Sequence, residues 1–386
     1  MEVELHQAID EIDSALWDEL APAENPFLSH RFLAILERSG SAARETGWHP
    51  LHAVIKDRGE MLAVVPMYLK SHSYGEYVFD WGWADAFQRA GGDYYPKLQS
   101  AVPFTPVPGP RVLMRQGDKQ RLPEVGVALK QVADRLAFSS FHLTFCTYEE
   151  WQALGDVGFL QRRGIQYHWE NRDYSGFDDF LADLRSSKRK MIRKERRRVQ
   201  QDEIEVRMLR DPDEVATALE AFYPFYLSTV DKRWGSAYLH QRFFSMLARE
   251  MSEKVAFAAA HRDGRLIAGA LNLVGSDTLY GRNWGCLQDC EFLHFETCYY
   301  QAIEHAIAQK LQRVEAGAQG PHKLQRGYAP VLTYSVHYVR HESFRDAISR
   351  FLVAENREID GRMEEMLGST PFHRQNPDHS SPRVQS

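Results

Sequence analysis

Two stretches of the chain repeat the same order of apolar and charged positions. In residues 53–63 an apolar run reaches a charged turn that contains glycine, and a second apolar run follows; residues 259–268 do the same. This order is typical of a β-hairpin. Some twenty residues further on, Asp80-Trp81-Gly82 is matched by Asn283-Trp284-Gly285. The nearly constant offset predicts two related folding units in tandem, with a groove between them as a place for a ligand.

Hydrophobic spacing predicts the elements of the first unit. These are helices at 10–20 and 29–38, strands at 51–56, 61–69 and 77–80, a helix at 122–137 and a strand at 141–145. Ser29 is the expected N-cap of the second helix. Five prolines predict an extended, irregular segment at 94–113.

The second unit repeats this order. We predict helices at 177–200, 212–227 and 238–250, strands at 255–261, 266–274 and 278–284, a long helix at 295–311, strands at 313–316 and 335–338, and a last helix at 344–367. The fold class is therefore predicted as α+β, with two tandem units that are each a mainly antiparallel twisted sheet flanked by helices. We place the units at residues 1–165 and 166–367. Residues 368–386 are polar, contain three prolines and are predicted to be a disordered tail.

Composition limits the environment and the partners. The chain has 386 residues and a formal net charge of −6, so the protein as a whole is not attracted to phosphate or anionic lipid. No apolar run reaches the length of a membrane span, and the N-terminus is acidic where a signal peptide would be basic. Four cysteines give no disulfide framework. We predict a cytoplasmic protein without stable membrane insertion.

One predicted helix is an exception to the acidic charge. Residues 188–198 contain eight cations in eleven positions, and apolar residues form only one stripe of this helix. Like charges weaken a helix, which favours a use for them, and phosphate-rich partners fit best. The predicted phosphate-binding residues are Lys188, Arg189, Arg193, Lys194 and Arg197. The alternative is a solvated face balanced by the acidic residues at 178, 179 and 183.

Cys286, Cys290, His294 and Cys298 recur every four residues, which invites a metal interpretation. In a helix each four-residue step rises about 6 Å, so the outer pair would lie roughly 18 Å apart. Zinc ligands must all lie about 2.0–2.3 Å from one ion. We therefore predict no metal site and interpret the cysteines as small apolar residues.

The start of the long helix and the loop after the next strand are predicted to meet at one edge of the sheet. There Glu296 or His322 is predicted to take a proton from an amine nucleophile, and Lys323 and Arg326 to meet an anionic group or a developing oxyanion. His294 and His322 are equally well explained as ordinary helix-start and loop residues.

The strand that ends with Arg282, Asn283 and Trp284 is predicted to supply a pocket wall, with Trp284 equally consistent with plain core. The segment before the long helix, 287–291, lacks the glycines that hold a pyrophosphate on backbone N–H groups. This argues against a nucleotide or coenzyme A pyrophosphate bound there in the usual way.

Several strings resemble one family. They are residues 74–80, 94–99, 102–107, 187–196, 293–300 and 317–320, with His322-Lys323. They resemble the FemAB-like peptidoglycan biosynthesis/recognition proteins of the acetyltransferase-like (GNAT) superfamily, and the likeness runs over about residues 10–365. The resemblance implies two GNAT-like domains and a relation to the Fem aminoacyltransferases, which move an amino acid from aminoacyl-tRNA to an amine on a peptidoglycan precursor. It also implies that the turn 323–328, with Arg326 and Tyr328, belongs to the site.

Two positions depart from the family pattern. The chain has Pro321 where the family usually has Glu, and Asn283 where an aromatic residue is frequent. If that Glu is the base elsewhere, this chain is altered or inactive. The coiled-coil arm of some Fem enzymes is also missing.

The resulting first hypothesis is an N-acyltransferase that acts on an amine acceptor, for example a nucleotide- or lipid-linked precursor, with aminoacyl-tRNA or acyl-CoA as donor and no resident cofactor. The second is a non-catalytic module that recognises peptidoglycan precursors or RNA through the same groove.

Overall fold

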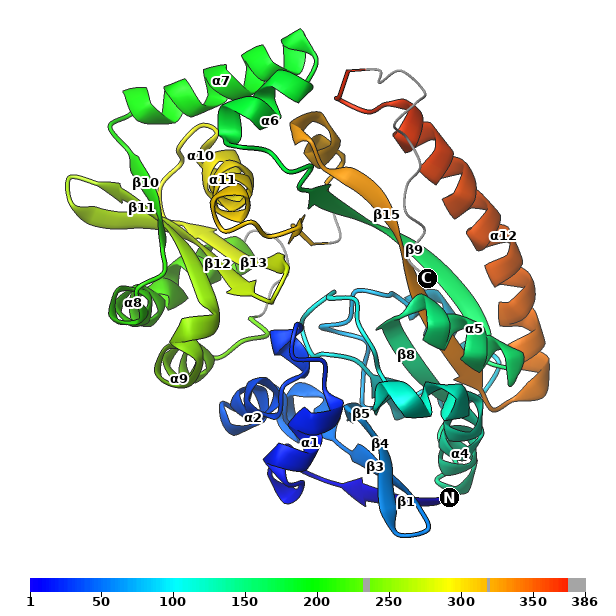
Figure 1. The fold of residues 1–386 in the computed structure, drawn as a ribbon. Helices are drawn as coiled ribbons and strands as arrows, with labels where there is room; N and C mark the ends of the chain where they lie inside the picture. The colour runs from blue at the N-terminus through cyan, green and yellow to red at the C-terminus, as the bar shows by residue number, and fades with distance from the viewer. Residues whose placement is uncertain (232–236, 318–319, 374–386) are drawn as a thin grey trace.

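The computed structural model describes residues 1–231, 237–317 and 320–373. Figure 1 shows the arrangement of the elements. The strands are β1 (Glu2–His6), β2 (Trp48–Pro50), β3 (His52–Asp57), β4 (Glu60–Val65), β5 (Met67–Lys70), β6 (Lys97–Ser100), β7 (Leu113–Met114), β8 (Ser140–Cys146), β9 (Leu160–Glu170), β10 (Glu205–Leu209), β11 (Val255–Arg262), β12 (Arg265–Val274), β13 (Thr278–Cys286), β14 (Arg313–Glu315) and β15 (Ala329–Val339).

The helices surround these strands. They are α1 (Ser14–Leu20), α2 (His30–Arg38), α3 (Trp81–Arg89), α4 (Leu122–Arg135), α5 (Tyr148–Asp156), α6 (Phe177–Asp183), α7 (Ser186–Gln201), α8 (Pro212–Asp231), α9 (Gln241–Met251), α10 (Leu293–Phe295), α11 (Gln301–Ala308) and α12 (Glu342–Gly368). A π-helical segment, η6 (Glu296–Tyr300), joins α10 to α11, and a short 3-10 turn, η7 (Pro321–Arg326), precedes β15.

Among the described residues the strands form two sheets. The smaller has the order β1-β3-β4-β7, and the larger has the order β10-β11-β12-β13-β14-β9-β15-β8-β6-β5-β2. Only β13–β14 and β6–β8 pair in parallel; the other described pairings are antiparallel. The predicted α+β class with mainly antiparallel sheets is confirmed.

Both predicted hairpins exist and use the same turn chemistry. β3 pairs with β4 around Arg58 and Gly59, and β11 pairs with β12 around Asp263 and Gly264. All four turn residues have positive φ, between 51° and 86°. Positive φ at both central residues matches the twist of a two-residue hairpin, and this is why glycine follows a polar residue in each.

The internal repeat does not extend to the two Trp-Gly pairs. Trp284 lies on β13, but Trp81 begins α3, so the two Trp-Gly pairs occupy different structures. The predicted strand at 77–80 is also wrong: this segment ends in the buried carboxylate of Asp80, which accepts bonds from Ser73, Tyr94 and Lys97. Side-chain bonding replaces strand pairing there.

The two halves of the chain share secondary structure. β15 pairs with β9 along its length and with β8 from the first half. In Figure 1, β9 and β15 run as long adjacent strands beside α12. The predicted division between residues 165 and 166 therefore falls inside β9. One continuous sheet contains strands of both halves, and the division into two units remains a prediction.

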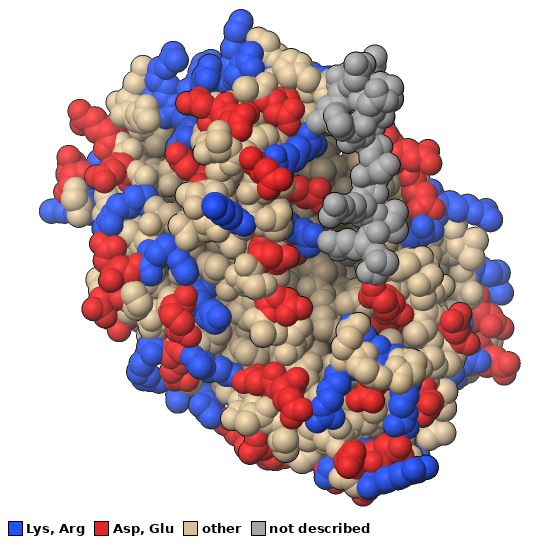
Figure 2. Space-filling model, in the orientation of Figure 1, with Lys and Arg blue, Asp and Glu red and all other residues tan. Residues whose placement is uncertain are grey.

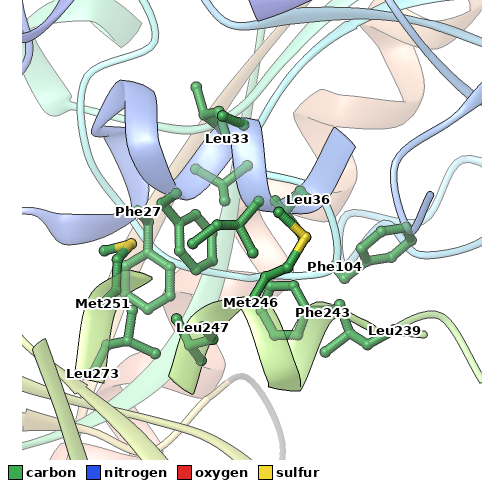
Figure 3. Packing of buried hydrophobic residues seen from close by; sticks show 14 of the residues in the cluster. Phe27, Leu33, Leu36, Phe104, Leu239, Phe243, Met246, Leu247, Met251 and Leu273 are labelled. Carbon is green, nitrogen blue, oxygen red and sulfur yellow. The ribbon is translucent and has the colours of Figure 1, made fainter. Parts of the chain in front are cut away.

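The largest apolar cluster also spans the halves. Leu36 of α2 packs toward Phe243, Met246 and Leu247 of α9, as Figure 3 shows. These side chains are at most 5% exposed. Burial on this scale contributes roughly 1.5–3 kcal/mol per large apolar side chain, so α2 and α9 hold the two halves together.

The end of the chain differs from its prediction in part. Phe372 is 6% exposed and its backbone pairs with Leu184, so residues 369–373 pack against the second half. The rest of the predicted disordered tail, 374–386, lies outside the described residues.

Candidate functional site

A cavity of about 940 Å³ lies between residues of the first and second halves. The first half contributes residues near α2 and the segments 76–79 and 103–106. The second half contributes the end of α8, the start of α9, β12, β13, the π-helical segment and η7. Its volume is that of an ordinary small-molecule site. A ligand there would touch both halves, as the sequence predicted for the groove.

One side of the cavity is apolar and aromatic. It is formed by Phe27, Phe32, Leu36, Phe104, Val230, Tyr238, Leu239 and Phe243. Phe104 of the first half stacks on Tyr238 of the second, with ring centroids 5.4 Å apart. This wall excludes water, which strengthens any charged contact made on the other side.

Arg282 of β13 brings a cation to the cavity. Its guanidinium lies over the Phe27 ring at 4.7 Å and donates to the Gly281 carbonyl at 2.7 Å. Burial lowers the pKa of this guanidinium, and burial also raises the pKa of Glu315 to about 7, 3.7 Å away. Nε and Nη2 of Arg282 have no hydrogen-bond partner among the described residues. These donors are suited to an anionic ligand group.

Asn283 and Trp284 line the cavity on the same strand. The Trp284 ring meets His294 edge-on at 5.4 Å, and His294 also lines the cavity. Arg282, Asn283 and Trp284, which the sequence predicted as a pocket wall, therefore all line the cavity, and Trp284 is only partly buried.

His322 reaches the cavity from η7. Its Nε2 lies 3.0 Å from the Tyr299 hydroxyl, and Tyr299 projects from the π-helical segment. Single π-turns inside a helix are frequent at functional sites, because they displace side chains from the regular spacing. The structure thus joins the helix start and the loop after β14, as predicted from the sequence.

Lys323 lies beside His322 and is 3% exposed. Its Nζ donates to the carbonyl oxygens of Ala316 at 2.6 Å and Gly317 at 3.0 Å. Burial lowers the pKa of this ammonium to about 8. Two carbonyls use two of its three N–H donors, which leaves one for a group in the cavity.

Glu296 does not join this group. It is 5% exposed and accepts bonds from Arg196 at 3.0–3.2 Å and from Gln301 at 2.9 Å. It is absent from the cavity lining among the described residues. The structure therefore brings together His322 and Lys323 but directs Glu296 toward α7. Glu296 is not placed to act as the base.

Arg326 and Tyr328 are also outside the described lining. Arg326 makes a two-point ion pair with Glu195 of α7 and stacks 3.5 Å over Phe295. Tyr328 is fully buried beside Tyr299, with ring centroids 5.5 Å apart. In this structure both residues brace the turn that presents His322 and Lys323, rather than facing a ligand.

The predicted phosphate-binding cations lie on α7. Arg193, Lys194 and Arg197 are exposed, whereas Lys188 and Arg189 are partly buried. Arg193 pairs with the exposed Asp178 at 3.0 Å. Figure 2 shows Lys and Arg gathered along the upper edge of the molecule, where Figure 1 places α7. α7 adds no described residue to the cavity lining, so the basic surface and the cavity are separate places.

The four-residue series of cysteines and histidine has varied surroundings. Cys286 donates to the Gln288 carbonyl at 2.8 Å, Cys290 packs with the apolar cluster around Ile267, and Cys298 lines the cavity. No group of His, Cys, Asp or Glu among the described residues is placed to hold a metal ion.

No described helix is long and apolar enough to cross a membrane.

A buried charge cluster in the first half was not predicted as part of the site. Lys97 donates to Glu76 at 2.9 Å and to Asp80, and Lys70 lies 3.9 Å from Glu76. Glu76 and Tyr77 line the cavity. The signal was present in the sequence: Lys70 ends an apolar run, Lys97 follows two tyrosines and a proline, and Glu76 and Asp80 are four residues apart between the two lysines. A buried lysine requires a carboxylate partner.

Comparisons with known proteins agree with this architecture. A model of the FemAB-like family, described as peptidoglycan biosynthesis/recognition, matches residues 8–374. No curated protein matches the chain. The structure is similar to that of FemX, with 11% identity, a TM-score of 0.55, and 90% of this chain and 100% of that chain covered.

Two further structures are similar. One is a conserved protein of unknown function from Bacteroides thetaiotaomicron VPI-5482, with 12% identity, a TM-score of 0.51, and coverage of 87% and 99%. The other is the C-terminal DUF2156 domain of a putative lysylphosphatidylglycerol synthetase from Agrobacterium fabrum, with 10% identity, a TM-score of 0.51, and coverage of 84% and 95%. The fold is therefore that of FemX.

Proposed function

The chain belongs to the FemAB-like family of peptidoglycan biosynthesis/recognition proteins, and from this premise we propose that it is an N-acyltransferase. The reaction moves an acyl or aminoacyl group from an activated donor to an amine acceptor, for which a peptidoglycan precursor is the first candidate. Aminoacyl-tRNA and acyl-CoA are the donors to consider. The family's function supports the proposal, and the chemistry below depends on this chain's own cavity.

The observation that carries the proposal is the meeting of Arg282, His322 and Lys323 in one cavity lined by both halves. An amine that attacks an activated acyl carbon must lose a proton, and the carbonyl oxygen becomes an oxyanion. His322 takes the proton from the amine, and the remaining N–H of Lys323 stabilises the oxyanion. The tetrahedral intermediate then collapses, the bond to the donor oxygen or sulfur breaks, and His322 returns the proton to this leaving group. Arg282 holds a carboxylate or phosphate of a substrate through its guanidinium.

Because the chain has Pro321 at the position of the family's usual Glu, the general base must be another residue. Family members usually carry Glu there, and a proline has no proton to exchange. The adjacent His322, 3.0 Å from the Tyr299 hydroxyl, supplies a titratable side chain within the same cavity. The proposed base is therefore His322.

Turnover with a panel of donors tests the proposal. The full chain is incubated with aminoacyl-tRNAs and acyl-CoAs in the presence of amine acceptors, and N-acylated product is measured. Product formation that follows enzyme concentration supports acyl transfer. Saturable binding of donors and acceptors without product across the panel supports the second candidate, a non-catalytic module that recognises peptidoglycan precursors or RNA.

The exposed cations of α7 give a separate prediction for tRNA as donor. We expect the triple substitution of Lys190, Lys194 and Arg197 by Ala to weaken tRNA binding at low salt. Each lost phosphate contact reduces the slope of log K against log salt by roughly 0.7–0.9. The measurement is binding of labelled tRNA at several salt concentrations. Arg196 is left intact because its ion pairs with Glu296 and Glu304 hold α7 in place.

A matched triple controls for net charge. Lys119, Arg135 and Arg350 are exposed cations outside α7, and their replacement by Ala changes the total charge equally. If both triples lower tRNA affinity to the same extent, or if neither does, α7 is not the phosphate-binding surface.

A further inference from the structure

Glu76 is the only carboxylate among the described residues that line the cavity. It lies in the first half, whereas Arg282, His322 and Lys323 come from the second. An amine acceptor arrives mostly as an ammonium ion at neutral pH, since a primary alkyl amine titrates near pH 10. The wall that carries Arg282 repels such a cation. Glu76 is the described group of the cavity with the opposite sign.

The two oxygens of Glu76 have different surroundings. Oε2 accepts from Lys97 at 2.9 Å. Oε1 is buried and has no hydrogen-bond partner among the described residues; Lys70 Nζ lies 3.9 Å away, beyond hydrogen-bond distance. Lys70 instead donates to the Tyr74 carbonyl at 3.1 Å and lies 3.7 Å over the Trp48 ring. A buried carboxylate oxygen without a donor is costly, so an absent donor is expected at this wall.

The charges around Glu76 leave room for one more cation. Lys97 and the Ser73 hydroxyl hold the pKa of Asp80 below its usual range, so Asp80 is ionised, and the two carboxylates hold the pKa of Lys97 above its usual range. Burial lowers the pKa of Lys70 to about 7 and raises that of Glu76 to about 7. Two carboxylates therefore face one firmly charged lysine. A ligand ammonium would complete the balance.

We propose that Glu76 binds the primary ammonium group of the acceptor through Oε1, on the wall of the cavity that the first half contributes. The proposal rests on the proposed function for the meaning of acceptor, but it concerns binding only. It defines the substrate class as a molecule with a primary amine for Glu76 and an anionic group for Arg282. Glu76 is thus a specificity-determining residue that the sequence analysis did not single out.

The test uses two probes that differ in one group. Both 6-aminohexanoate and hexanoate carry the carboxylate, and only the first carries the ammonium. Dissociation constants are measured by saturation-transfer NMR titration at pH 8. We expect the wild type to bind 6-aminohexanoate about tenfold more tightly, as for one charge-assisted hydrogen bond. Glu76→Gln should abolish this preference and leave hexanoate binding unchanged.

Two controls are needed: one checks that Glu76→Gln folds, and the other checks that loss of a carboxylate elsewhere on the protein has no effect. Lys97 keeps Asp80 and Ser73 as partners in Glu76→Gln, so the variant is expected to fold, which circular dichroism checks. Glu364→Gln removes an exposed carboxylate of α12 and should keep the full preference. Preference retained in Glu76→Gln, or no preference or no 6-aminohexanoate binding in the wild type, overturns the proposal.

The wild type alone provides a second measurement. Lowering the pH through about 7 neutralises Glu76 and charges Lys70, and both changes weaken ammonium binding while the probe amine stays charged. Asp80, Lys97 and Arg282 keep their charge in this range. The ratio of the two affinities should fall toward one between pH 8 and pH 6. A ratio independent of pH contradicts the assignment.

The result is separable from the proposed function. Acyl transfer by a protein without the ammonium preference would leave the N-acyltransferase standing and overturn the role of Glu76. Ammonium preference without any turnover would do the reverse.

Discussion

Arg326→Met lowers the free energy of unfolding by about 3–5 kcal/mol, because it leaves a buried carboxylate without its cation. Arg326 is 5% exposed and pairs with Glu195 through Nε at 3.2 Å and Nη2 at 2.7 Å. It also donates to the His322 carbonyl at 2.9 Å. The Tyr300 hydroxyl donates to the same carboxylate, so one substitution disturbs α7, the π-helical segment and η7 together. Urea denaturation measures the change.

Two variants identify the cause. Arg193→Met removes an exposed ion pair with Asp178 and should change stability by less than about 0.5 kcal/mol. The double variant Glu195→Gln/Arg326→Met removes both charges and should recover part of the loss. An Arg326→Met protein within about 1 kcal/mol of the wild type would mean that the turn presenting His322 and Lys323 is braced by other contacts.

Lys323→Met lowers kcat for acyl transfer by about 10²–10³, the usual effect of removing one donor to a developing oxyanion. The charged ammonium is required for this role. Since burial places the pKa of Lys323 at about 8, the charge is present below pH 8 and is lost as the pH rises through that value. Wild-type kcat should therefore fall above pH 8, and the Met variant should lack this fall.

A structural role alone would give another pattern. The Lys323 ammonium holds the carbonyls of Ala316 and Gly317, so its loss also lowers the melting temperature. It would not by itself remove the alkaline fall in kcat. Lys254→Met, at an exposed position away from the cavity, should match the wild type in kcat and in its pH profile. An alkaline fall that persists in Lys323→Met assigns that titration to another group.

Local patterns predicted the elements that depend on local chemistry. Both hairpins follow from an apolar run and a turn that only Gly and polar residues adopt readily at positive φ. Ser29 caps α2 through the backbone N–H of Phe32, as its position predicted. The predicted helix 177–200 is divided at Leu184, whose backbone pairs with Phe372 nearly two hundred residues away. Hydrophobic spacing carries no signal for such a distant contact.

The same limit applies to the candidate site. His322 and Lys323 were predicted correctly as neighbours of the helix start, because adjacency of a helix N-terminus and the following loop is a property of the topology. The direction of Glu296 was not predictable, since a π-turn shifts the spacing of side chains along the helix and Arg196 draws the carboxylate toward α7. Glu76 was missed because it lies in the irregular segment between β5 and α3, where no period relates residues to a common face.

Occupation of the cavity by a covalent label tests the central claim most directly. Cys298 lines the cavity and is partly buried, Cys146 is buried, and Cys286 and Cys290 are replaced by Ala to leave one reactive thiol. Benzyl methanethiosulfonate adds a bulky group through a reducible disulfide, and mass spectrometry confirms a single label. If acyl transfer takes place in the cavity, labelling abolishes turnover, a reductant restores it, and protein that also carries Cys298→Ala is unaffected. Fully labelled protein that transfers acyl groups at the unlabelled rate would contradict the account.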